Sequence, residues 1–368
     1  MPVLRAPPVK VGKVYLTATA LFASSSNELL SSLVSRLEQY SGGAPLSHEE
    51  QPGCHLELMD SSSMVVAEVS DADASVGAQV MYGLHKRRLP TLCLMRRDCT
   101  EGSFAASLTS GSISDPLLTT AQYGDAAEAA AAVDAFVRPP PQPGRIFVID
   151  GGDGAGKQTQ TKLFMDRLRA EGYPVATLDY PHDSALNGKL IRTLLSGAKG
   201  DLKSVNPLLF ASLYAQNRAD TAPLLNHWLS RGVNVVLDRY VEANFGHQAS
   251  KLPAAERPAL IKMFTAFEHD WLDLPRAHRV VYLDLPPAEA AKALAADGTR
   301  AALDIHETAG DDYKTAVRDT FVWSATEFDH WTRLPCVDDA GVRYTKQELH
   351  ERLYAALAPD LVNRGKPE

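Results

Sequence analysis

Short apolar runs alternate with amphipathic stretches along the first third of the chain. Runs rich in β-branched residues predict buried strands, and apolar residues at helical spacing predict helices between them. The expected strands are 14–17, 64–69 and 90–95, and the expected helices are 27–40, 76–86 and 126–136. Strands separated by helices favour a parallel sheet with helices on its faces.

The rest of the chain follows the same alternation. Apolar runs predict strands at 145–150, 175–179, 233–238 and 279–284, with helices between them, including 161–170 and 346–356. We therefore expect an α/β protein with two domains, each built on a parallel sheet flanked by helices.

A proline-rich segment at 138–144 separates these two parts, and four of its seven residues are proline. Such a density of proline disfavours both helix and sheet and gives a semi-rigid spacer. The expected organisation is a first domain at 1–137, a linker at 138–144, a second domain at 145–360 and a tail at 361–368.

The composition narrows the possible partners. Of 368 residues, 45% are hydrophobic and 22% are charged, and the formal net charge is −8. An acidic chain argues against a broad surface for nucleic acid or anionic lipid. No apolar stretch reaches membrane-spanning length, and the four cysteines lack zinc-site spacing. We expect a cytoplasmic protein that binds neither nucleic acid nor membranes.

The segment 151–157 fits the phosphate-loop pattern G-x-x-x-x-G-K and lies between a predicted strand and a predicted helix. Its glycines, Gly151, Gly154 and Gly156, let backbone N–H groups turn inward around phosphate oxygens, and Lys157 brings a charge to the β- and γ-phosphates. These features predict an ATP site.

The position after that lysine normally holds a serine or threonine whose hydroxyl binds Mg²⁺. Here it is Gln158, followed by Thr159. The Mg²⁺ ligand in this loop is therefore either the amide oxygen of Gln158 or the hydroxyl of Thr159.

Further motifs extend the pattern over about 210 residues. They stand at 150–160, 179–181, 217–218, 238–240, 247–248, 282–286 and 304–307. In content and order they resemble the thymidylate kinase family. The resemblance implies a P-loop nucleoside monophosphate kinase fold, transfer of the γ-phosphoryl group of ATP to dTMP, a requirement for Mg²⁺, and a possible homodimer.

The resemblance also implies roles for individual residues at the phosphates. Asp153 corresponds to a carboxylate near the acceptor's sugar and phosphate, and Arg239 to a guanidinium that holds the monophosphate. Asp238 corresponds to a residue that holds magnesium through water. Arg300 lies in the segment that matches the family's mobile lid.

Other matched positions concern the acceptor's base and sugar. Tyr214 and Arg218 are one helical turn apart, and in the family that pair stacks on thymine and hydrogen-bonds it. Asn244 and Gln248 correspond to residues that line the base and sugar pocket, and Tyr180 belongs to the matched Tyr-Pro pair.

Two departures bear on activity. His182 and Asp183 stand where the family has a phosphate-binding arginine, and Ala301-Ala302-Leu303 follow Arg300 where further basic residues are expected. Loss of a charge contact in phosphoryl transfer slows the reaction by orders of magnitude. Two alternatives therefore stand: a non-catalytic structural or regulatory subunit of a larger assembly, and a kinase for another nucleoside monophosphate.

Residues 13–137 resemble the nucleoside 2-deoxyribosyltransferase superfamily, closest to its deoxynucleoside-monophosphate N-glycosidase branch. The matching segments are 14–16, 65–70, 75–77 and 90–94. Tyr15 and Glu68 are retained, but Gln79 replaces the nucleophilic glutamate and His55 a supporting aspartate. The segment 17–21 also replaces a phosphate loop. An amide is a poor nucleophile, so we predict an inactive, Rossmann-like domain that either binds a nucleotide or serves in packing or dimerisation.

Overall fold

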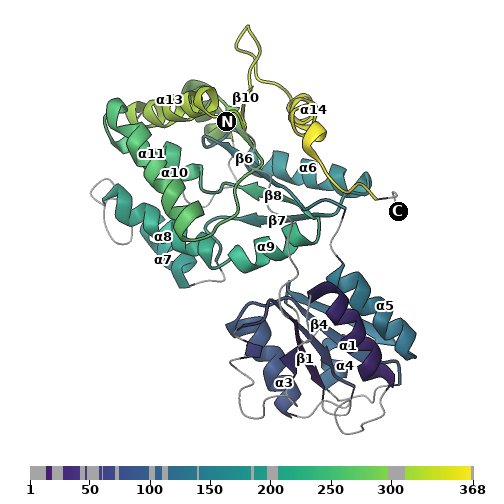
Figure 1. Cartoon of the computed structure of the whole chain (residues 1–368). Helices are drawn as coiled ribbons and strands as arrows, with labels where there is room; N and C mark the ends of the chain where they lie inside the picture. Colours follow the sequence, from purple (N-terminus) through teal and green to yellow (C-terminus); the bar gives the residue numbers. More distant parts are fainter. Residues whose placement is uncertain are drawn as a thin grey trace. The chain divides into compact units, whose positions relative to one another are not determined.

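The chain folds into two compact units, Met1–Pro140 and Pro141–Glu368 (Figure 1). The computed structural model describes residues 14–18, 28–41, 46–47, 58–59, 61–70, 74–98, 104–109, 115–138, 141–183, 186–196, 206–296 and 311–365. Within these residues each unit contains one parallel sheet of five strands.

The first sheet has the strand order β2-β1-β3-β4-β5. Its strands are β1 Val14–Ala18, β2 Leu46–Ser47, β3 Met64–Glu68, β4 Thr91–Arg96 and β5 Leu118–Tyr123. The central strands β3 and β4 are buried along almost their whole length, as expected for a parallel sheet covered on both faces.

Helices α1 (Glu28–Ser41) and α5 (Ala126–Val137) cover one face of this sheet, where Leu33, Val66 and Val133 share a core. Asp125 begins α5 by accepting a hydrogen bond from the backbone N–H of Glu128, a favourable helix cap. The remaining helical elements are α3 Ala74–Met81, the π-helix η1 Tyr82–Lys86 and α4 Phe104–Thr109.

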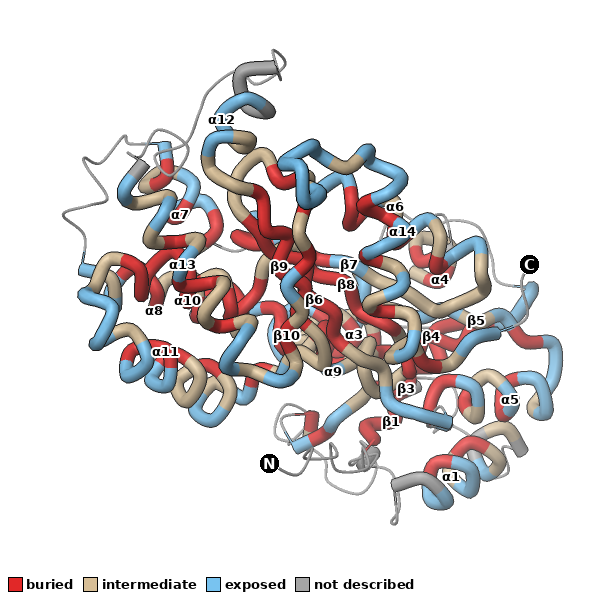
Figure 2. Tube along the Cα trace, turned by 90° about the horizontal axis from the view of Figure 1, so that it is seen from above, coloured by how far each residue is buried: buried red, intermediate tan, exposed pale blue. Residues whose placement is uncertain are grey.

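The second sheet has the strand order β10-β9-β6-β8-β7. Its strands are β6 Ile146–Gly151, β7 Val175–Asp179, β8 Asn234–Asp238, β9 Arg279–Asp284 and β10 Trp331–Pro335. Figure 2 shows β6, β8 and β9 as buried runs, whereas the outer surface of helix α11 (Arg257–Thr265) is exposed. Because β6 pairs parallel with both β8 and β9, the loops after these three strands leave the same edge of the sheet.

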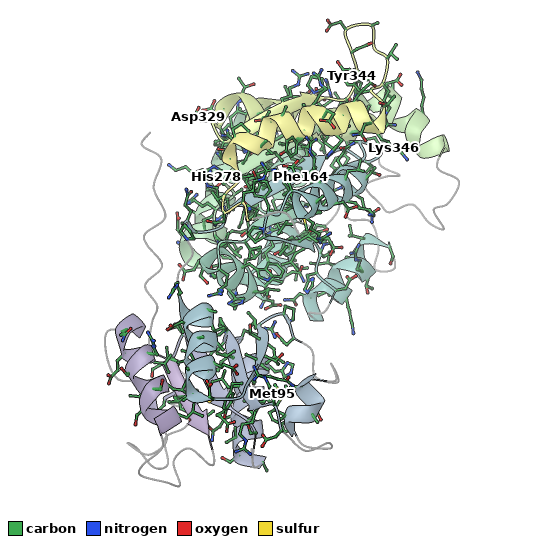
Figure 3. All side chains as sticks on the ribbon, turned by 90° about the vertical axis from the view of Figure 1, so that its right-hand side faces the viewer. Met95, Phe164, His278, Asp329, Tyr344 and Lys346 are labelled. Carbon is green, nitrogen blue, oxygen red and sulfur yellow. The ribbon has the colours of Figure 1, made fainter. Side chains whose placement is uncertain are left out.

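Two layers of helices enclose the second sheet. Helices α6 (Lys157–Ala170) and α14 (Lys346–Leu357) share a core with one face of it, in which Phe164 and Leu353 are fully buried. On the other face the ring of Tyr282 stacks on Phe321 of α13 (Asp311–Glu327), with 4.9 Å between centroids. Figure 3 labels Met95 and Phe164, which are buried in the first and second unit respectively.

The helical elements of this unit have the following bounds: α6 Lys157–Ala170, α7 Leu186–Leu195, α8 Pro207–Ala219, α9 Ala222–Ser230, α10 Ala243–His247, η3 Ala249–Lys251, η4 Ala254–Glu256, α11 Arg257–Thr265, η5 Ala266–Trp271, α12 Pro287–Ala296, α13 Asp311–Glu327, α14 Lys346–Leu357 and η6 Ala358–Asp360. Among the described helices, none combines the length and the apolar character needed to span a bilayer.

The structure confirms the α/β class with parallel, helix-flanked sheets. The seven predicted strands are present, within one residue at each end. The predicted helix at 76–86 needs correction, because it is an α-helix followed by a π-helical turn. Strands β2, β5 and β10 were not predicted. The assignment of the first unit to a deoxyribosyltransferase-like fold stays a prediction.

Candidate active site

A glycine-rich loop joins β6 to α6 and forms an open cradle. Gly154 and Gly156 have φ of 76° and 90°, which L side chains rarely adopt. A Cβ atom on Gly151 would lie 2.8 Å from the carbonyl oxygen of Leu283, so only glycine lets β6 and β9 approach here. A Cβ atom on Gly152 or Gly156 would meet no heavy atom within 4 Å, so these two residues border open space.

Lys157 begins α6 and folds back across this loop. Its Nζ donates to the carbonyl oxygens of Gly151 and Gly152 at 3.0 Å each, and lies 3.9 Å from Oδ1 of Asp153. Burial lowers the pKa of Lys157, and the neighbouring Arg239 adds to that effect. The ammonium group is thus held beside the cradle, where phosphate oxygens would replace the carbonyl contacts.

Two carboxylates, the buried Asp150 and the half-buried Asp238, lie at the ends of adjacent strands at this edge. Asp238 pairs in register with Ile149, which places it beside Asp150. Asp150 is 0% exposed, and its Oδ1 accepts the N–H of Gly151 at 2.7 Å. Its Oδ2 has no hydrogen-bond partner within the part of the chain that the structure describes. Burial raises the pKa of both carboxyl groups, while Lys157 and Arg239 oppose the rise.

Arg239 follows Asp238 and turns into the left-handed region, with φ of 66°. Its Nη2 lies 3.2 Å from Oδ1 of Asp153, and its Nη1 lies 4.0 Å from Oδ1 of Asp150. Burial opposes the charge, but Asp150, Asp153 and Asp238 together raise the pKa of Arg239 above its ordinary value. The strained backbone therefore aims a permanent cation at the phosphate loop.

His247 extends this group toward α13. Its Nε2 contacts Nη1 of Arg239, and its Nδ1 lies 3.3 Å from the hydroxyl of Tyr313. Both rings line a cavity of about 60 Å³ beside the phosphate loop, together with Asp153, Lys314 and Arg318. Basic and hydrogen-bonding groups on α13 thus face the loop across a small cavity.

Comparison with known proteins agrees with this geometry. The thymidylate kinase family model matches residues 149–333, half of the chain. The chain belongs to the thymidylate kinase family. It is 31% identical to thymidylate kinase of Bifidobacterium longum strain NCC 2705 over 179 residues, which cover 48% of this chain and 82% of that enzyme.

Two eukaryotic thymidylate kinases are also similar. The human enzyme is 31% identical over 154 residues, which cover 40% of this chain and 65% of the human protein. A solved structure of the Candida albicans enzyme covers 61% of this chain and 97% of that one, with 19% identity and a TM-score of 0.45. The family match lies entirely within the second unit, hereafter the thymidylate kinase domain.

The structure brings some of the expected residues of this thymidylate kinase domain together and leaves others apart. Asp153, Lys157, Asp238 and Arg239 converge at the loop. Gln158 and Thr159 are both exposed on the first turn of α6. Arg300 lies outside the described residues.

The residues expected at the base belong to a buried hydrogen-bonded network. Arg218 is 1% exposed and donates to both carboxylate oxygens of Glu268, from Nε at 2.6 Å and from Nη2 at 2.7 Å. Asn244 donates to the same carboxylate at 2.9 Å. The half-buried ring of Tyr214 has its centroid 6.0 Å from Cζ of Arg218.

Tyr180 and Gln248 flank this network. The Tyr180 hydroxyl pairs with Oγ1 of Thr221 at 2.6 Å, and burial raises the pKa of Tyr180 to about 12. Gln248 is 1% exposed and accepts from Lys251 at 2.9 Å. Both side chains are thus fixed from within the protein.

Four residues of this region were missed as site residues. Asp150 and His247 belong to the motifs at 150–160 and 247–248. For Asp150, a carboxylate at the end of an apolar strand was a signal that the sequence offered. Glu268 lies 50 residues from Arg218, and no pattern marked it. Arg192 of α7 donates to Asp183 at 3.0 Å and to the Pro181 carbonyl at 3.3 Å, beside the position where a family arginine is missing.

A divalent cation fits the carboxyl edge of the sheet. Within the described residues there is no group of three or more His, Cys, Asp or Glu side chains placed to hold a metal. Mg²⁺ normally needs only one or two carboxylates, with water and substrate phosphates completing its shell. Two groups meet that requirement: Oδ2 of Asp150, which no described residue hydrogen-bonds, and the neighbouring Asp238.

In the first unit, Gln79 forms a buried hydrogen-bond centre. Its Oε1 accepts from the hydroxyls of Tyr15 at 2.9 Å and Thr17 at 2.7 Å, and its Nε2 donates to Ser75 at 3.0 Å. Glu68 is separately engaged, because its Oε1 accepts from Tyr123 and from Ser70. His55, the third residue expected at this site, lies outside the described residues.

Proposed function

We propose that the thymidylate kinase domain transfers the γ-phosphoryl group of ATP to dTMP, giving dTDP and ADP. The observation that carries this proposal is that Lys157 Nζ and Arg239 Nη2 both lie close to Oδ1 of Asp153, at 3.9 and 3.2 Å. Two cations that share one carboxylate at a phosphate loop suit a donor phosphate and an acceptor phosphate held in line.

Each residue has a defined task in that reaction. Backbone N–H groups of the loop and Nζ of Lys157 would hold the β- and γ-phosphates of ATP. The guanidinium of Arg239 would bind the acceptor's monophosphate through paired hydrogen bonds. Asp153 offsets the charge of the two cations before substrates arrive. Lys314 adds positive charge across the cavity, whereas Arg318 is paired with Asp284.

Asp150 and Asp238 would hold Mg²⁺ through water, and the cation would neutralise charge on the β- and γ-phosphates. Their carboxyl pKa values are raised by burial, so competition by protons should weaken metal binding as the pH falls. We therefore expect a requirement for Mg²⁺ that becomes more stringent in mildly acidic buffer.

A coupled assay of ADP release with purified full-length protein, dTMP and ATP tests the proposal. We expect turnover that needs dTMP and Mg²⁺, and a loss of at least about 10²-fold in kcat for Lys157→Ala. Lys162→Ala is the matched control, because Lys162 lies on the same helix with its side chain 76% exposed. Absence of turnover, or equal turnover in both variants, would refute the proposal.

The identity of the acceptor needs its own comparison. Parallel assays with dTMP, dUMP, dCMP and dGMP should give the highest kcat/KM for dTMP. A higher value for another monophosphate would retain the kinase and replace its substrate. Sedimentation of the purified protein would separate the homodimer implied by the family from a subunit that requires other chains.

For the first unit we propose a domain without glycosidase activity. The Gln79 amide cannot supply the negative charge that a glycosyl transition state needs, and its oxygen already accepts two hydroxyl hydrogen bonds. Incubation of the full-length protein with deoxynucleoside monophosphates should release no free base. Base release would overturn this part of the proposal.

A further inference from the structure

We propose that Glu268 is a positioning residue that selects the acceptor base, by fixing which hydrogen-bonding atoms Arg218 and Asn244 present to it. The selected class is a pyrimidine with a 4-oxo group and an N3–H, as in thymine and uracil. This inference rests on the proposed function, because it assumes that Arg218 and Asn244 face the acceptor.

Glu268 lies at the centre of the buried network and is itself 1% exposed. Its Oε2 accepts from Nε of Arg218, and its Oε1 accepts from Nη2 of Arg218 and from Nδ2 of Asn244. Nη1 of Arg218 donates to the carbonyl oxygen of Tyr240 at 3.2 Å. One carboxylate therefore orients both residues expected at the base.

The carboxylate determines the direction of the Asn244 amide. An ionised carboxylate only accepts hydrogen bonds, so Asn244 must turn its NH₂ group toward Glu268 and its carbonyl oxygen away. Arg218 uses three of its five N–H groups within the network, which leaves two donors for another partner. The edge offered to a ligand consequently combines donors from Arg218 with an acceptor from Asn244.

This pattern matches one kind of pyrimidine. Thymine and uracil present an acceptor at O4 and a donor at N3, whereas cytosine presents an amino donor at C4 and an acceptor at N3. Cytosine would set donor against donor at Arg218 and acceptor against acceptor at Asn244. Because both side chains are at most 3% exposed, water cannot relieve the mismatch, and we expect discrimination of about 10²–10⁴-fold.

The local backbone gives separate support. Glu268 lies on η5, a π-helical segment that follows α11 directly. π-Helical turns are rare and occur often at functional sites. A buried ion pair is also a weak source of stability compared with apolar packing, so stability alone does not account for Arg218 and Glu268 at this place.

The test compares dTMP and dCMP as acceptors for the full-length wild type, Glu268→Gln and Glu268→Asp. A glutamine can donate to the Asn244 carbonyl and reverse that amide, so we expect the ratio of kcat/KM for dTMP to dCMP to fall at least tenfold, mainly through KM. Aspartate at position 268 remains an acceptor, so the dTMP-to-dCMP ratio of Glu268→Asp should stay within about threefold of the wild-type ratio. Glu256→Gln makes the same change at an exposed position and should leave the ratio unaltered.

Calorimetric titration with MgATP identifies folded variants. If Glu268→Gln fails to fold, Asn244→Ala replaces it, because this change keeps the Arg218–Glu268 pair and removes the proposed acceptor for N3–H. It too should lower the ratio at least tenfold. A folded variant with a wild-type ratio overturns the inference alone, whereas a wild type that neither binds nor phosphorylates dTMP overturns the proposed function as well.

Discussion

Glu242 offers a quantitative test of the electrostatics near the site. This residue precedes α10, is 3% exposed, and its Oε2 has no hydrogen-bond partner among the described residues. Burial, with a further contribution from Asp150, raises the pKa of Glu242 from 4.5 to about 8. At neutral pH the folded thymidylate kinase domain therefore holds a proton on Glu242 that the unfolded chain has already released.

The sign of the effect follows from that difference. Because the folded state binds the proton more tightly, the stabilisation by this group is complete below pH 4.5 and is lost as the pH rises toward about 8. At about 1.36 kcal/mol for each pH unit of separation, the whole window corresponds to about 5 kcal/mol. Roughly 3.5 kcal/mol of this lies between pH 5 and pH 8.

Glu242→Gln removes the titration and should remove that decline. Unfolding in urea can be followed by tryptophan fluorescence, because Trp228, Trp271, Trp323 and Trp331 all lie in the thymidylate kinase domain. We expect the variant to gain about 3.5 kcal/mol relative to wild type between pH 5 and pH 8. Glu327→Gln, an exposed control, should follow the wild type. Parallel pH profiles for wild type and Glu242→Gln would refute the reasoning.

Three further predictions address other contacts. Gly151→Ala should lower the unfolding free energy by about 1–3 kcal/mol, because its Cβ atom would meet the adjacent strand, whereas Gly152→Ala should leave stability unchanged and weaken MgATP binding in calorimetry. His247→Ala should lower kcat/KM for dTMP about tenfold at unchanged MgATP affinity, since Arg239 loses one of its supports; equal losses for both substrates would contradict this. Gln79→Leu should destabilise the first unit by about 2–4 kcal/mol, measured by circular dichroism, because two buried hydroxyls lose their acceptor; an unchanged melting curve would argue against it.

The central strands were predictable because they are buried on both faces. Strands β3, β4, β6, β8 and β9 read as nearly continuous apolar runs, as expected for a parallel sheet covered on both faces. Strands β5 and β10 lie at sheet edges and mix polar with apolar residues, so no run marks them. Their pairing depends on neighbours that are distant in sequence.

The phosphate loop was predictable for a similar reason, since its glycines and Lys157 are contiguous and each has a local conformational or electrostatic task. The residues that pair with the charged side chains of the site were not predictable from the sequence. Arg218 and Glu268 are 50 positions apart, and Arg239 and Asp153 are 86 apart. A sequence motif identifies the charged residue that binds a ligand. The residue of opposite charge that orients it comes from a distant part of the chain and is identified only by the fold.

The carboxyl edge of the second sheet collects groups that a protein selected for stability alone would avoid. Asp150 and Glu242 each keep a buried oxygen that no described residue hydrogen-bonds, and Arg239 is held in a left-handed conformation. Each feature costs free energy of folding. Metal and phosphate are the partners that would repay these costs on binding, since a cation satisfies carboxylate oxygens and a phosphate satisfies the cations around Asp153. Binding of MgATP should therefore raise the unfolding free energy of the wild-type thymidylate kinase domain. The increase should be smaller in an Asp150→Asn variant, which lacks the charge to hold the cation.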